Sequence, residues 1–287
     1  MNRKEQKPVY YIASFSGGKD STSMVLRLIE LGYPLDEVLC CDTTMEFPAM
    51  YRHIEKVKAV VEAAGIKFTM LRAEHDFVYY LTEHPAEREE GSRYYGMPGL
   101  GWPGVHSRWC TKALKVKIIN DYLRELRGRY TIKQYVGIAA DEEYRLDRKS
   151  NKNHNRIYPL VEWGWKEEDA MAYCRVWGYD WEGLYDLFER VSCWCCPLQP
   201  LDELRTLRSQ FPDLWQQLLD LDSQQIKPFK GGKSVLYLEK RFALEDVLQA
   251  DGESISNRAF FKDLKRHIAG EVTAEEILEE RRKKRAA

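Results

Sequence analysis

Two groups of residues in this 287-residue chain have the types and spacing that chemistry requires, and the first is the run SGGKDS at residues 16–21. Adjacent glycines allow a tight backbone that points several N–H groups at one anion. Lys19 can supply a positive charge for phosphate, and Asp20 can hold Mg²⁺ or orient Lys19. Ser16 and Ser21 can add hydroxyl groups. The run therefore predicts a loop that binds the phosphates of ATP or a related adenine nucleotide.

The sequence on either side places this loop between a strand and a helix. Residues 9–15 are β-branched and aromatic, as in a buried strand, and apolar residues recur at helical spacing over 21–31. Gly17 and Gly18 would then lie at the carboxyl end of a strand, next to the positive end of a helix. The run matches neither GxxxxGK[ST] nor GxGxxG. A glycine turn with incidental charge is the alternative.

The second group consists of cysteines. The chain has seven cysteines. We expect it in the cytoplasm, where reducing conditions make a disulfide framework unfavourable. Cys193 and Cys196 are separated by two residues, a spacing that lets two thiolates face one metal centre. An iron–sulfur cluster, a structural zinc ion and buried cysteines without a metal are the alternatives. Cys40, Cys41 and Cys174 lie within a predicted strand and helix, where core packing is the simpler interpretation.

Charged residues farther along the chain are candidates for binding a substrate. Arg108, Lys112 and Lys115 follow an irregular segment rich in Gly and Pro, and could hold a phosphate, a sulfate or a nucleic-acid backbone. Glu142 and Arg145 follow a predicted strand over 130–140 and could close over the nucleotide. Solvated surface charge is the alternative in each case.

The order of predicted elements indicates the fold class. Strands over 9–15, 38–41 and 67–71 alternate with helices over 21–31 and 50–64. This order predicts an α/β protein with an open, mostly parallel, twisted sheet and helices on both faces. The chain becomes mostly helical after residue 158. We therefore expect a nucleotide-binding α/β domain over 1–197 and a mainly helical C-terminal extension over 198–287.

Composition limits the partners of the protein. The net charge is −1, so charge alone does not indicate a nucleic-acid-binding protein. No apolar run approaches the ~20 residues that a membrane span needs, and the polar start of the chain does not resemble a secretory signal. We expect a cytoplasmic protein without a membrane partner.

Five segments together resemble the PP-loop ATP pyrophosphatases, also called the adenine nucleotide alpha hydrolase-like superfamily. Within it the chain is most similar to the phosphoadenosine phosphosulfate reductase family. The segments are SGGKDS at 16–21, DTTMEFP at 42–48, RWCTKALK at 108–115, GIAADEEYR at 137–145 and CWCCP at 193–197. The resemblance covers about residues 8–200. Their shared order and spacing are far more specific than any single segment.

The resemblance implies further site residues. Asp42, Thr43 and Gly137 are expected to contact the nucleotide. Three residues depart from the family's pattern: Thr44 stands in place of Gly, Ala139 in place of Arg and Tyr144 in place of Ser. These changes affect the side of the site that would bind sulfate or substrate, and leave the nucleotide loop intact.

The resemblance also implies a [4Fe-4S] cluster. Iron–sulfur relatives carry a Cys-Cys pair where this chain has Trp109-Cys110, so one ligand is missing. Cys110, Cys193 and Cys196 would hold the cluster, and Cys195 could be the fourth ligand. Alternatively the fourth iron stays open for sulfide or substrate.

The expected reaction follows from these features. Lys19 and Asp20 are the expected catalytic residues of an enzyme that binds ATP and Mg²⁺, adenylylates an acceptor and releases pyrophosphate. Cluster-assisted sulfur transfer would follow, with a nucleic-acid acceptor and a sulfur-donor protein as partners. No cysteine follows Cys196, which argues against reduction by a C-terminal cysteine. A sulfonucleotide reductase that uses an external thiol, and a nucleotide sensor or complex subunit without turnover, are the alternatives.

Overall fold

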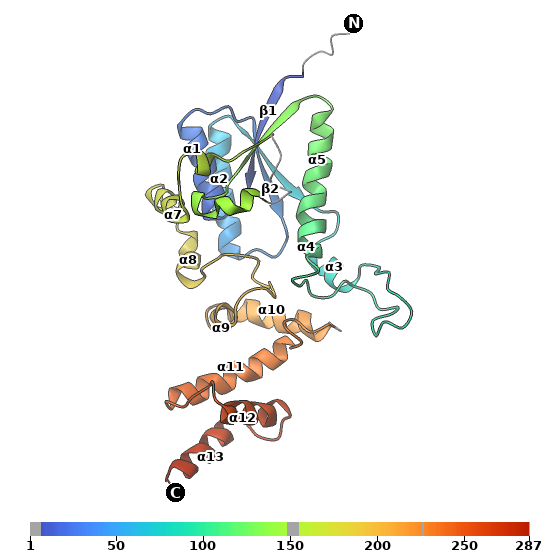
Figure 1. The fold of residues 1–287 in the computed structure, drawn as a ribbon, viewed down its shortest axis with the longest axis vertical. Coiled ribbons are helices and arrows are strands. Elements are labelled where there is room, and N and C mark those ends of the chain that lie inside the picture. Colours follow the sequence, from blue (N-terminus) through green and yellow to red (C-terminus); the bar gives the residue numbers. More distant parts are fainter. Residues whose placement is uncertain (1–6, 148–154, 226, 287) are drawn as a thin grey trace. The chain divides into compact units, whose positions relative to one another are not determined.

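A computed structural model describes residues 7–147, 155–225 and 227–286 of the protein (Figure 1). Five strands form one sheet in the order β3-β2-β1-β4-β5, and every neighbouring pair is parallel. The strands are β1 (Val9–Phe15), β2 (Glu37–Asp42), β3 (Lys67–Arg72), β4 (Thr131–Val136) and β5 (Arg156–Ile157). The predicted α/β class with a parallel sheet is confirmed. The two-residue strand β5 lies where the sequence indicated a loop.

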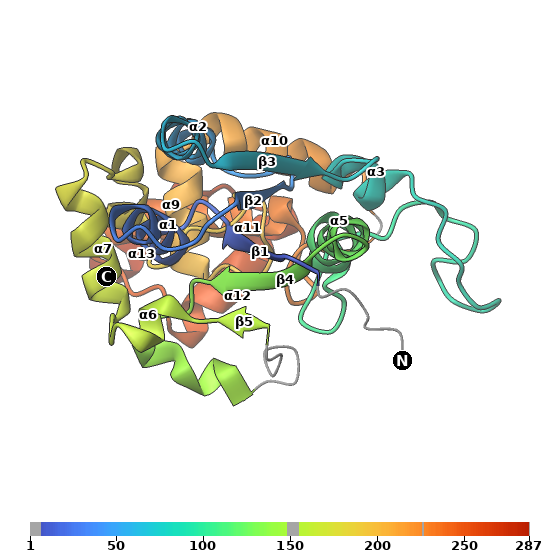
Figure 2. The ribbon, with the colours of Figure 1, turned by 90° about the horizontal axis from the view of Figure 1, so that it is seen from above.

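Helices cover both faces of this sheet. Helix α1 (Lys19–Glu30) and helix α2 (Pro48–Ala63) lie on one face, and helix α5 (Lys117–Arg127) lies on the other (Figure 2). On the α5 face, Leu123 and Leu126 pack against Ile12 of β1 and neighbouring strand residues. Strand β1 therefore lies between helices on both sides, which is why its central residues are fully buried.

The strand order changes direction between β1 and β4. The chain moves from β1 outward to β2 and β3, and then returns to the other side of β1 for β4. The loops that follow β1 and β4 consequently diverge at their carboxyl ends, where open α/β sheets bind ligands. Gly17 and Gly137 lie in these two loops.

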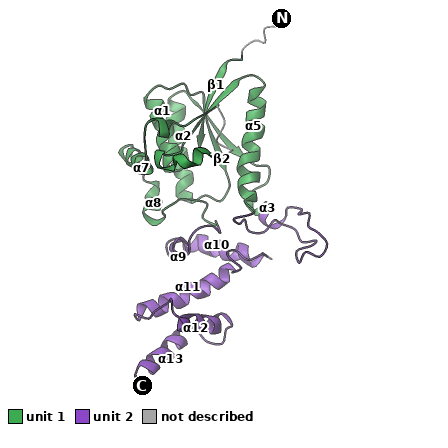
Figure 3. Cartoon of the chain, viewed as in Figure 1, with its two compact units in different colours: residues 1–80, 107–196 green, residues 81–106, 197–287 purple. Residues whose placement is uncertain are grey.

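The chain divides into two compact units (Figure 3). Unit 1 consists of residues 1–80 and 107–196, and unit 2 of residues 81–106 and 197–287. The sequence predicted a continuous domain over 1–197. The segment 81–106 belongs instead with the C-terminal helices, because Trp102 packs against Phe229 at 5.0 Å between ring centroids and donates to Asp222 at 2.8 Å.

Unit 1 contains the remaining short helices around the sheet. They are α3 (Phe77–Thr82, which runs into unit 2), α4 (Trp109–Thr111), η1 (Lys112–Val116), η2 (Ala140–Asp147), α6 (Pro159–Glu162), α7 (Glu167–Val176), η3 (Trp181–Gly183) and α8 (Leu184–Leu187). Element η1 is a single π-helical turn that joins α4 to α5. Such turns occur often at functional sites.

Unit 2 is helical, as the sequence predicted for the C-terminal part. Its helices are α9 (Leu201–Gln210), α10 (Pro212–Ser223), α11 (Val235–Ala250), α12 (Arg258–Ile268) and α13 (Ala274–Ala286). One hydrophobic core joins α11, α12 and α13, and includes Leu248, Phe260 and Ile277. Within the described part of the chain, no helix is long and apolar enough to cross a membrane.

Candidate nucleotide-binding site

The loop after β1 has the backbone conformation that an anion site needs. Gly17 has a φ of +80°, which places it in the left-handed region that favours glycine. A Cβ atom at Gly17 would lie 2.6 Å from the Met50 Sδ atom, so a larger residue does not fit. The indole N–H of Trp181 donates to the Gly17 carbonyl oxygen at 2.7 Å. Helix α1 begins two residues later, so its positive end faces the same region.

The two serines of the loop have different roles in the structure. The Ser21 hydroxyl accepts from the Ser16 backbone N–H at 3.1 Å and donates to the Gly18 carbonyl oxygen at 3.0 Å. Ser21 is buried and closes the loop on itself, whereas Ser16 is exposed. Of the two hydroxyls, that of Ser16 is the one accessible to a ligand.

Lys19 is positioned by two residues that the sequence did not single out. Its Nζ atom lies 2.6 Å from the Glu167 Oε2 atom, at the first turn of α7. Its backbone N–H donates to the Tyr185 hydroxyl at 3.1 Å. Lys19 is the first residue of α1 and directly follows the two glycines of the loop. A phosphate oxygen could therefore replace Glu167 as the partner of the ammonium group.

Asp20 has a carboxyl oxygen without a hydrogen-bond partner. Its Oδ1 atom is buried and lies 3.9 Å from the Lys19 Nζ atom, beyond hydrogen-bond distance. Burial raises the pKa of Asp20 to about 6, since the carboxylates of Glu167, Glu142 and Asp141 add to the effect and only Lys19 opposes it. A cation bound beside Asp20 would relieve this unfavourable charge.

Gly137 allows the end of β4 to lie close to the loop that follows β1. A Cβ atom at Gly137 would lie 3.1 Å from backbone atoms of Asp20 and Ser21, so β4 can approach the start of α1 only with glycine at this position. The predicted substrate residues Glu142 and Arg145 form an ion pair with each other in η2. The structure thus brings residues 16–21, Gly137 and Glu142 into one region of unit 1.

Asp42 and Thr43 lie at the carboxyl end of β2, next to β1. The Asp42 Oδ1 atom accepts from the Thr44 N–H at 2.7 Å and from the Tyr51 hydroxyl at 2.8 Å, and Arg72 Nε donates to Oδ2 at 2.9 Å. Burial acts to raise the pKa of Asp42, but these hydrogen bonds outweigh it and hold the pKa below its usual range. Asp42 therefore orders the loop after β2, where Thr44 has a φ of +67°.

The segment 193–196 forms a turn against the loop that follows β2. The Cys196 N–H donates to the Cys193 carbonyl oxygen at 3.1 Å, and the Trp194 N–H donates to the Met45 carbonyl oxygen at 3.2 Å. The Cys193 thiol lies 3.5 Å from the Glu46 Oε1 atom. Burial raises the pKa of the Cys193 thiol and keeps it protonated.

Lys115 lies on the π-helical turn and faces this cysteine. Its Nζ atom lies 3.8 Å from the Glu46 Oε1 atom. Burial acts to lower the pKa of Lys115, but the Glu46 carboxylate outweighs it, and the pKa is raised. Lys115 therefore stays charged beside the cysteine turn. Arg108 and Lys112 are exposed, and neither forms an ion pair with a described residue.

The predicted metal ligands do not form a complete set in this structure. Among the described residues, no three His, Cys, Asp or Glu side chains lie close enough to hold a metal ion. Cys195 is 1% exposed within the turn, and burial raises the pKa of its thiol well above the usual value. Cys110 lies on the short helix α4, apart from the turn in the sequence. The [4Fe-4S] cluster on these thiols therefore stays a prediction.

Sequence reasoning missed Glu167, Tyr185 and Asp141 as parts of the site. Glu167 and Tyr185 come from a later helical region whose spacing indicated only packing. Asp141 accepts from the Glu167 backbone N–H at 3.3 Å and so holds the start of α7 near the loop. No local pattern identifies these residues, because only the fold brings Asp141, Glu167 and Tyr185 beside residues 16–21.

Comparison with known families agrees with this arrangement. The model of the phosphoadenosine phosphosulfate reductase domain matches residues 10–199, about two thirds of the chain. The chain belongs to this family. The match begins in β1 and ends just after the cysteine turn, so it includes every candidate site residue named in unit 1.

Two individual proteins are also similar to this member of the family. An uncharacterized protein of Methanocaldococcus jannaschii is 27% identical over 220 residues, which make up 74% of this chain and 41% of that protein. The chain thus spans about two fifths of the length of the curated relative that it matches. The solved structure of the U34-tRNA thiolase NcsA from Methanococcus maripaludis with its [4Fe-4S] cluster is 17% identical, with a TM-score of 0.37, over 74% of this chain and 75% of that chain.

Proposed function

We propose that the protein binds ATP with Mg²⁺ at residues 16–21 and uses it to adenylylate an acceptor, with release of pyrophosphate. One observation carries this proposal: a glycine loop at the switch point of the sheet presents Lys19 and a buried, unpartnered carboxyl oxygen of Asp20 to the same region. Phosphate needs the positive groups, and a metal ion bound to phosphate needs the carboxylate. The family membership of the chain supports an adenine nucleotide as the ligand.

The residues near Asp20 fit Mg²⁺. This ion keeps several waters and is bound through one or two carboxylates together with substrate phosphates, so a set of three protein ligands is not required. Asp20 offers its unpartnered Oδ1 atom, and Glu167 becomes available once Lys19 turns toward phosphate. Bound there, Mg²⁺ would neutralise charge on the phosphate oxygens.

The proposed first step is a displacement at the α-phosphorus of ATP. An oxygen of the acceptor attacks this phosphorus, a new P–O bond forms, and the bond between the α-phosphorus and the bridging oxygen breaks. Pyrophosphate leaves with that bridging oxygen. The Lys19 ammonium group and the backbone N–H groups of Gly17 and Gly18 would stabilise the charge that develops on the phosphates.

The proposed second step is sulfur transfer. Sulfide delivered by a donor protein attacks the acceptor carbon that carries the adenylyl group, a C–S bond forms, and AMP leaves with the oxygen. We propose a nucleic-acid base as the acceptor, since exposed cations at Arg108 and Lys112 suit a phosphate backbone. Lys115 stays charged beside Cys193 and would hold an anionic sulfur species there.

The cluster on Cys110, Cys193 and Cys196, with Cys195 as a further candidate, stays a prediction, and neither step above uses it. Its test is the absorption spectrum and the iron content of anaerobically purified protein. If the cluster forms, Cys193→Ser and Cys196→Ser lose iron, whereas Cys174→Ser, a buried cysteine on α7, keeps it. Equal iron in all three variants contradicts the prediction.

The proposal is tested by incubating the full chain with α-labelled ATP, Mg²⁺, sulfide and single-stranded RNA or DNA, because AMP leaves the adenylylated acceptor only when sulfide displaces it. We expect AMP and pyrophosphate in equal amounts, and loss of both products in Lys19→Ala. Lys58→Ala, which removes a half-buried lysine on α2 that is paired with Glu55, should behave as wild type. Release of sulfite from a sulfonucleotide in the presence of a thiol, without pyrophosphate from ATP, would identify a reductase instead. Tight ATP binding without any product would identify a sensor or a complex subunit.

A further inference from the structure

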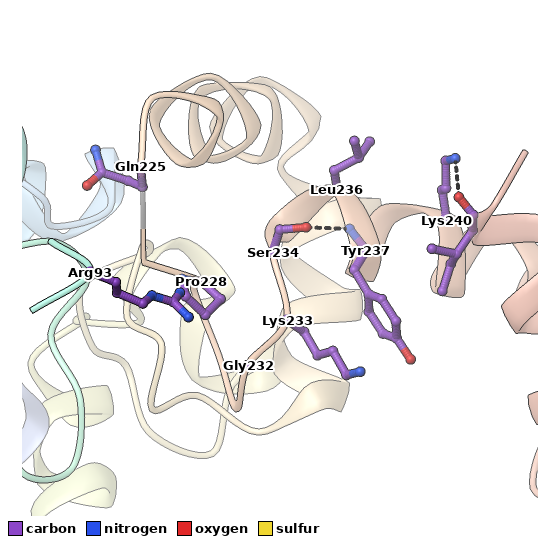
Figure 4. A pocket seen from close by; sticks show the side chains of 10 residues that line it. Arg93, Gln225, Pro228, Gly232, Lys233, Ser234, Leu236, Tyr237 and Lys240 are labelled. Carbon is purple, nitrogen blue, oxygen red and sulfur yellow. Dashed lines mark hydrogen bonds between the residues drawn. The ribbon is translucent and has the colours of Figure 1, made fainter.

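Unit 2 contains a pocket of its own, distinct in its residues from the nucleotide loop (Figure 4). Its volume is about 500 Å³, within the usual range for sites that bind small molecules. The cations Arg93, Lys233 and Lys240 line it, together with Ser234 and Tyr237. None of its lining residues is acidic. The pocket is therefore positively charged.

The two walls of the pocket are held together by one buried carboxylate. Arg93 comes from the irregular segment 81–106, Lys233 from the turn that precedes α11, and Lys240 from the first half of α11. Asp222 accepts from the Trp102 indole N–H of that segment at 2.8 Å, and from the Val235 backbone N–H of α11 at 2.6 Å. Lys227 ties the segment once more through a 3.0 Å hydrogen bond to the Leu100 carbonyl oxygen. This bonding makes the pocket a built feature of unit 2.

The cations of the pocket lack acidic partners among the described residues. Neither Arg93 nor Lys233 nor Lys240 forms an ion pair with any described residue; Lys240 donates to the Ile268 carbonyl oxygen at 3.1 Å instead. Elsewhere in the described part of unit 2, seven arginines are paired with carboxylates, whereas Arg88 donates to backbone carbonyl oxygens. The paired arginines are Arg205, Arg208, Arg241, Arg266, Arg281, Arg282 and Arg285. Unpaired positive charge gathered around one pocket favours an anion as its ligand.

Aromatic rings beside these cations narrow the chemistry of the ligand. The Lys233 ammonium group lies 4.4 Å from the centroid of the Tyr237 ring, and the Arg93 guanidinium lies 4.6 Å from that of Tyr94. Proteins bind single-stranded nucleic acids with cations that hold the phosphates and aromatic rings on which bases stack. The Lys230–Lys233 turn, which has glycines at both central positions, brings Lys233 to the pocket without a bulky side chain between the two lysines.

We propose that this pocket binds a phosphate and the adjoining base of a single-stranded nucleic acid. A free nucleotide shares that chemistry. We assign a single-stranded nucleic acid, and not a free nucleotide, because the proposed function requires a nucleic-acid acceptor. This choice rests on the proposed function. The three cations would contact the backbone of the acceptor at a point separate from the reacting base.

The test is binding of fluorescein-labelled 12-nucleotide RNA and DNA to the full chain, followed by anisotropy at several salt concentrations. The variant Arg93→Ala/Lys233→Ala/Lys240→Ala should bind at least tenfold more weakly than wild type. Since each phosphate neutralised on a single strand contributes about −0.7 to the slope of log K against log salt, the loss of the one phosphate held by the pocket should reduce the magnitude of the slope by about 0.7. The variant Arg93→Lys/Lys233→Arg/Lys240→Arg should keep most of the binding, which separates charge from folding.

Two controls decide between this proposal and its alternatives. Arg258→Ala/Lys262→Ala/Lys265→Ala removes the same charge from exposed positions on α12 outside the pocket, and should change binding less than threefold. An equal loss in both triple variants, or no binding of either oligonucleotide by wild type at low salt, would overturn the proposal. Displacement of the oligonucleotide by millimolar ATP in Lys19→Ala would show that the pocket takes a free nucleotide, and would also overturn it.

The outcome is independent of the test of the proposed function. Oligonucleotide binding that depends on the pocket, without formation of AMP and pyrophosphate, would leave the pocket assignment standing and reject adenylylation. If AMP and pyrophosphate form equally well with the pocket variant at every RNA concentration, adenylylation stands and the pocket assignment is rejected.

Discussion

Asp20→Asn should make the protein more stable at neutral and alkaline pH while it removes the nucleotide chemistry. The Asp20 carboxyl is buried beside three other carboxylates, with one oxygen unpartnered. Asparagine has nearly the same shape and carries no charge. The substitution therefore removes the electrostatic penalty and leaves the packing of the loop unchanged.

The size of the effect follows from the pKa of Asp20, which burial raises from 3.8 to about 6. Between these values the folded protein binds more protons at Asp20 than the unfolded chain does, so stability falls as pH rises through this window. A shift of about two units costs about 3 kcal/mol once both states are ionised, near pH 8. At pH 4 the folded carboxyl is protonated, and the cost is below about 1 kcal/mol.

The assay is urea unfolding of wild type and Asp20→Asn, followed by tryptophan fluorescence from pH 4 to pH 8. The variant should gain about 3 kcal/mol of unfolding free energy at pH 8 and almost nothing at pH 4. Glu62→Gln, an exposed carboxylate on α2, should change stability little at either pH. A variant that is less stable than wild type at pH 8, or a difference that does not change with pH, would refute the argument. Mg²⁺ and ATP should stabilise wild type and fail to stabilise Asp20→Asn.

Three further substitutions test the loop and its surroundings. Gly17→Ala should lower the unfolding free energy by about 1–3 kcal/mol and abolish ATP binding, since the new Cβ would lie 2.6 Å from the Met50 Sδ atom at a positive φ. Urea unfolding measures the change in stability, and calorimetry measures the loss of ATP binding. Unchanged stability would contradict the geometry of the loop. Thr44→Gly should raise the unfolding free energy by about 1 kcal/mol, because glycine relieves the φ of +67° in a β-branched residue. Glu167→Gln should bind ATP several-fold more tightly in EDTA, because the ammonium group of Lys19 no longer leaves an ion pair; weaker binding under these conditions would mean that Glu167 contributes directly to the nucleotide.

The parallel sheet and the nucleotide loop were both predictable from local patterns. A β-branched strand, two glycines and an amphipathic helix follow one another within residues 9–31, and each signal depends on neighbours in the sequence. The same holds for the helical character of the chain after residue 198. The strand β5 could not be predicted, because two residues carry no periodicity and pair only through the neighbouring strand β4.

The partners of the loop depend on contacts between distant residues. Glu167 lies 148 positions from Lys19, and a glutamate at the first turn of a helix ordinarily indicates only a favourable position near the helix dipole. The pairing of Lys115 with Glu46 is similar, since the sequence predicted a substrate contact for this lysine. In both cases a charged residue has a partner that only the folded chain supplies.

The carboxylate of Asp222 has a consequence for the order in which the chain can fold. It binds Trp102, which lies in a segment inserted between the two halves of unit 1. During synthesis from the N-terminus this segment emerges more than 100 residues before Asp222, so its tryptophan can contact Asp222 and Phe229 only after the C-terminal part has been made. A shortened protein that ends at residue 196 would carry the same segment permanently without its partner. Isolation of unit 1 therefore requires replacement of residues 81–106 by a short polar linker. In the full chain, we expect residues 81–106 to be a binding site for chaperones that recognise exposed aromatic segments until the C-terminal part has been synthesised.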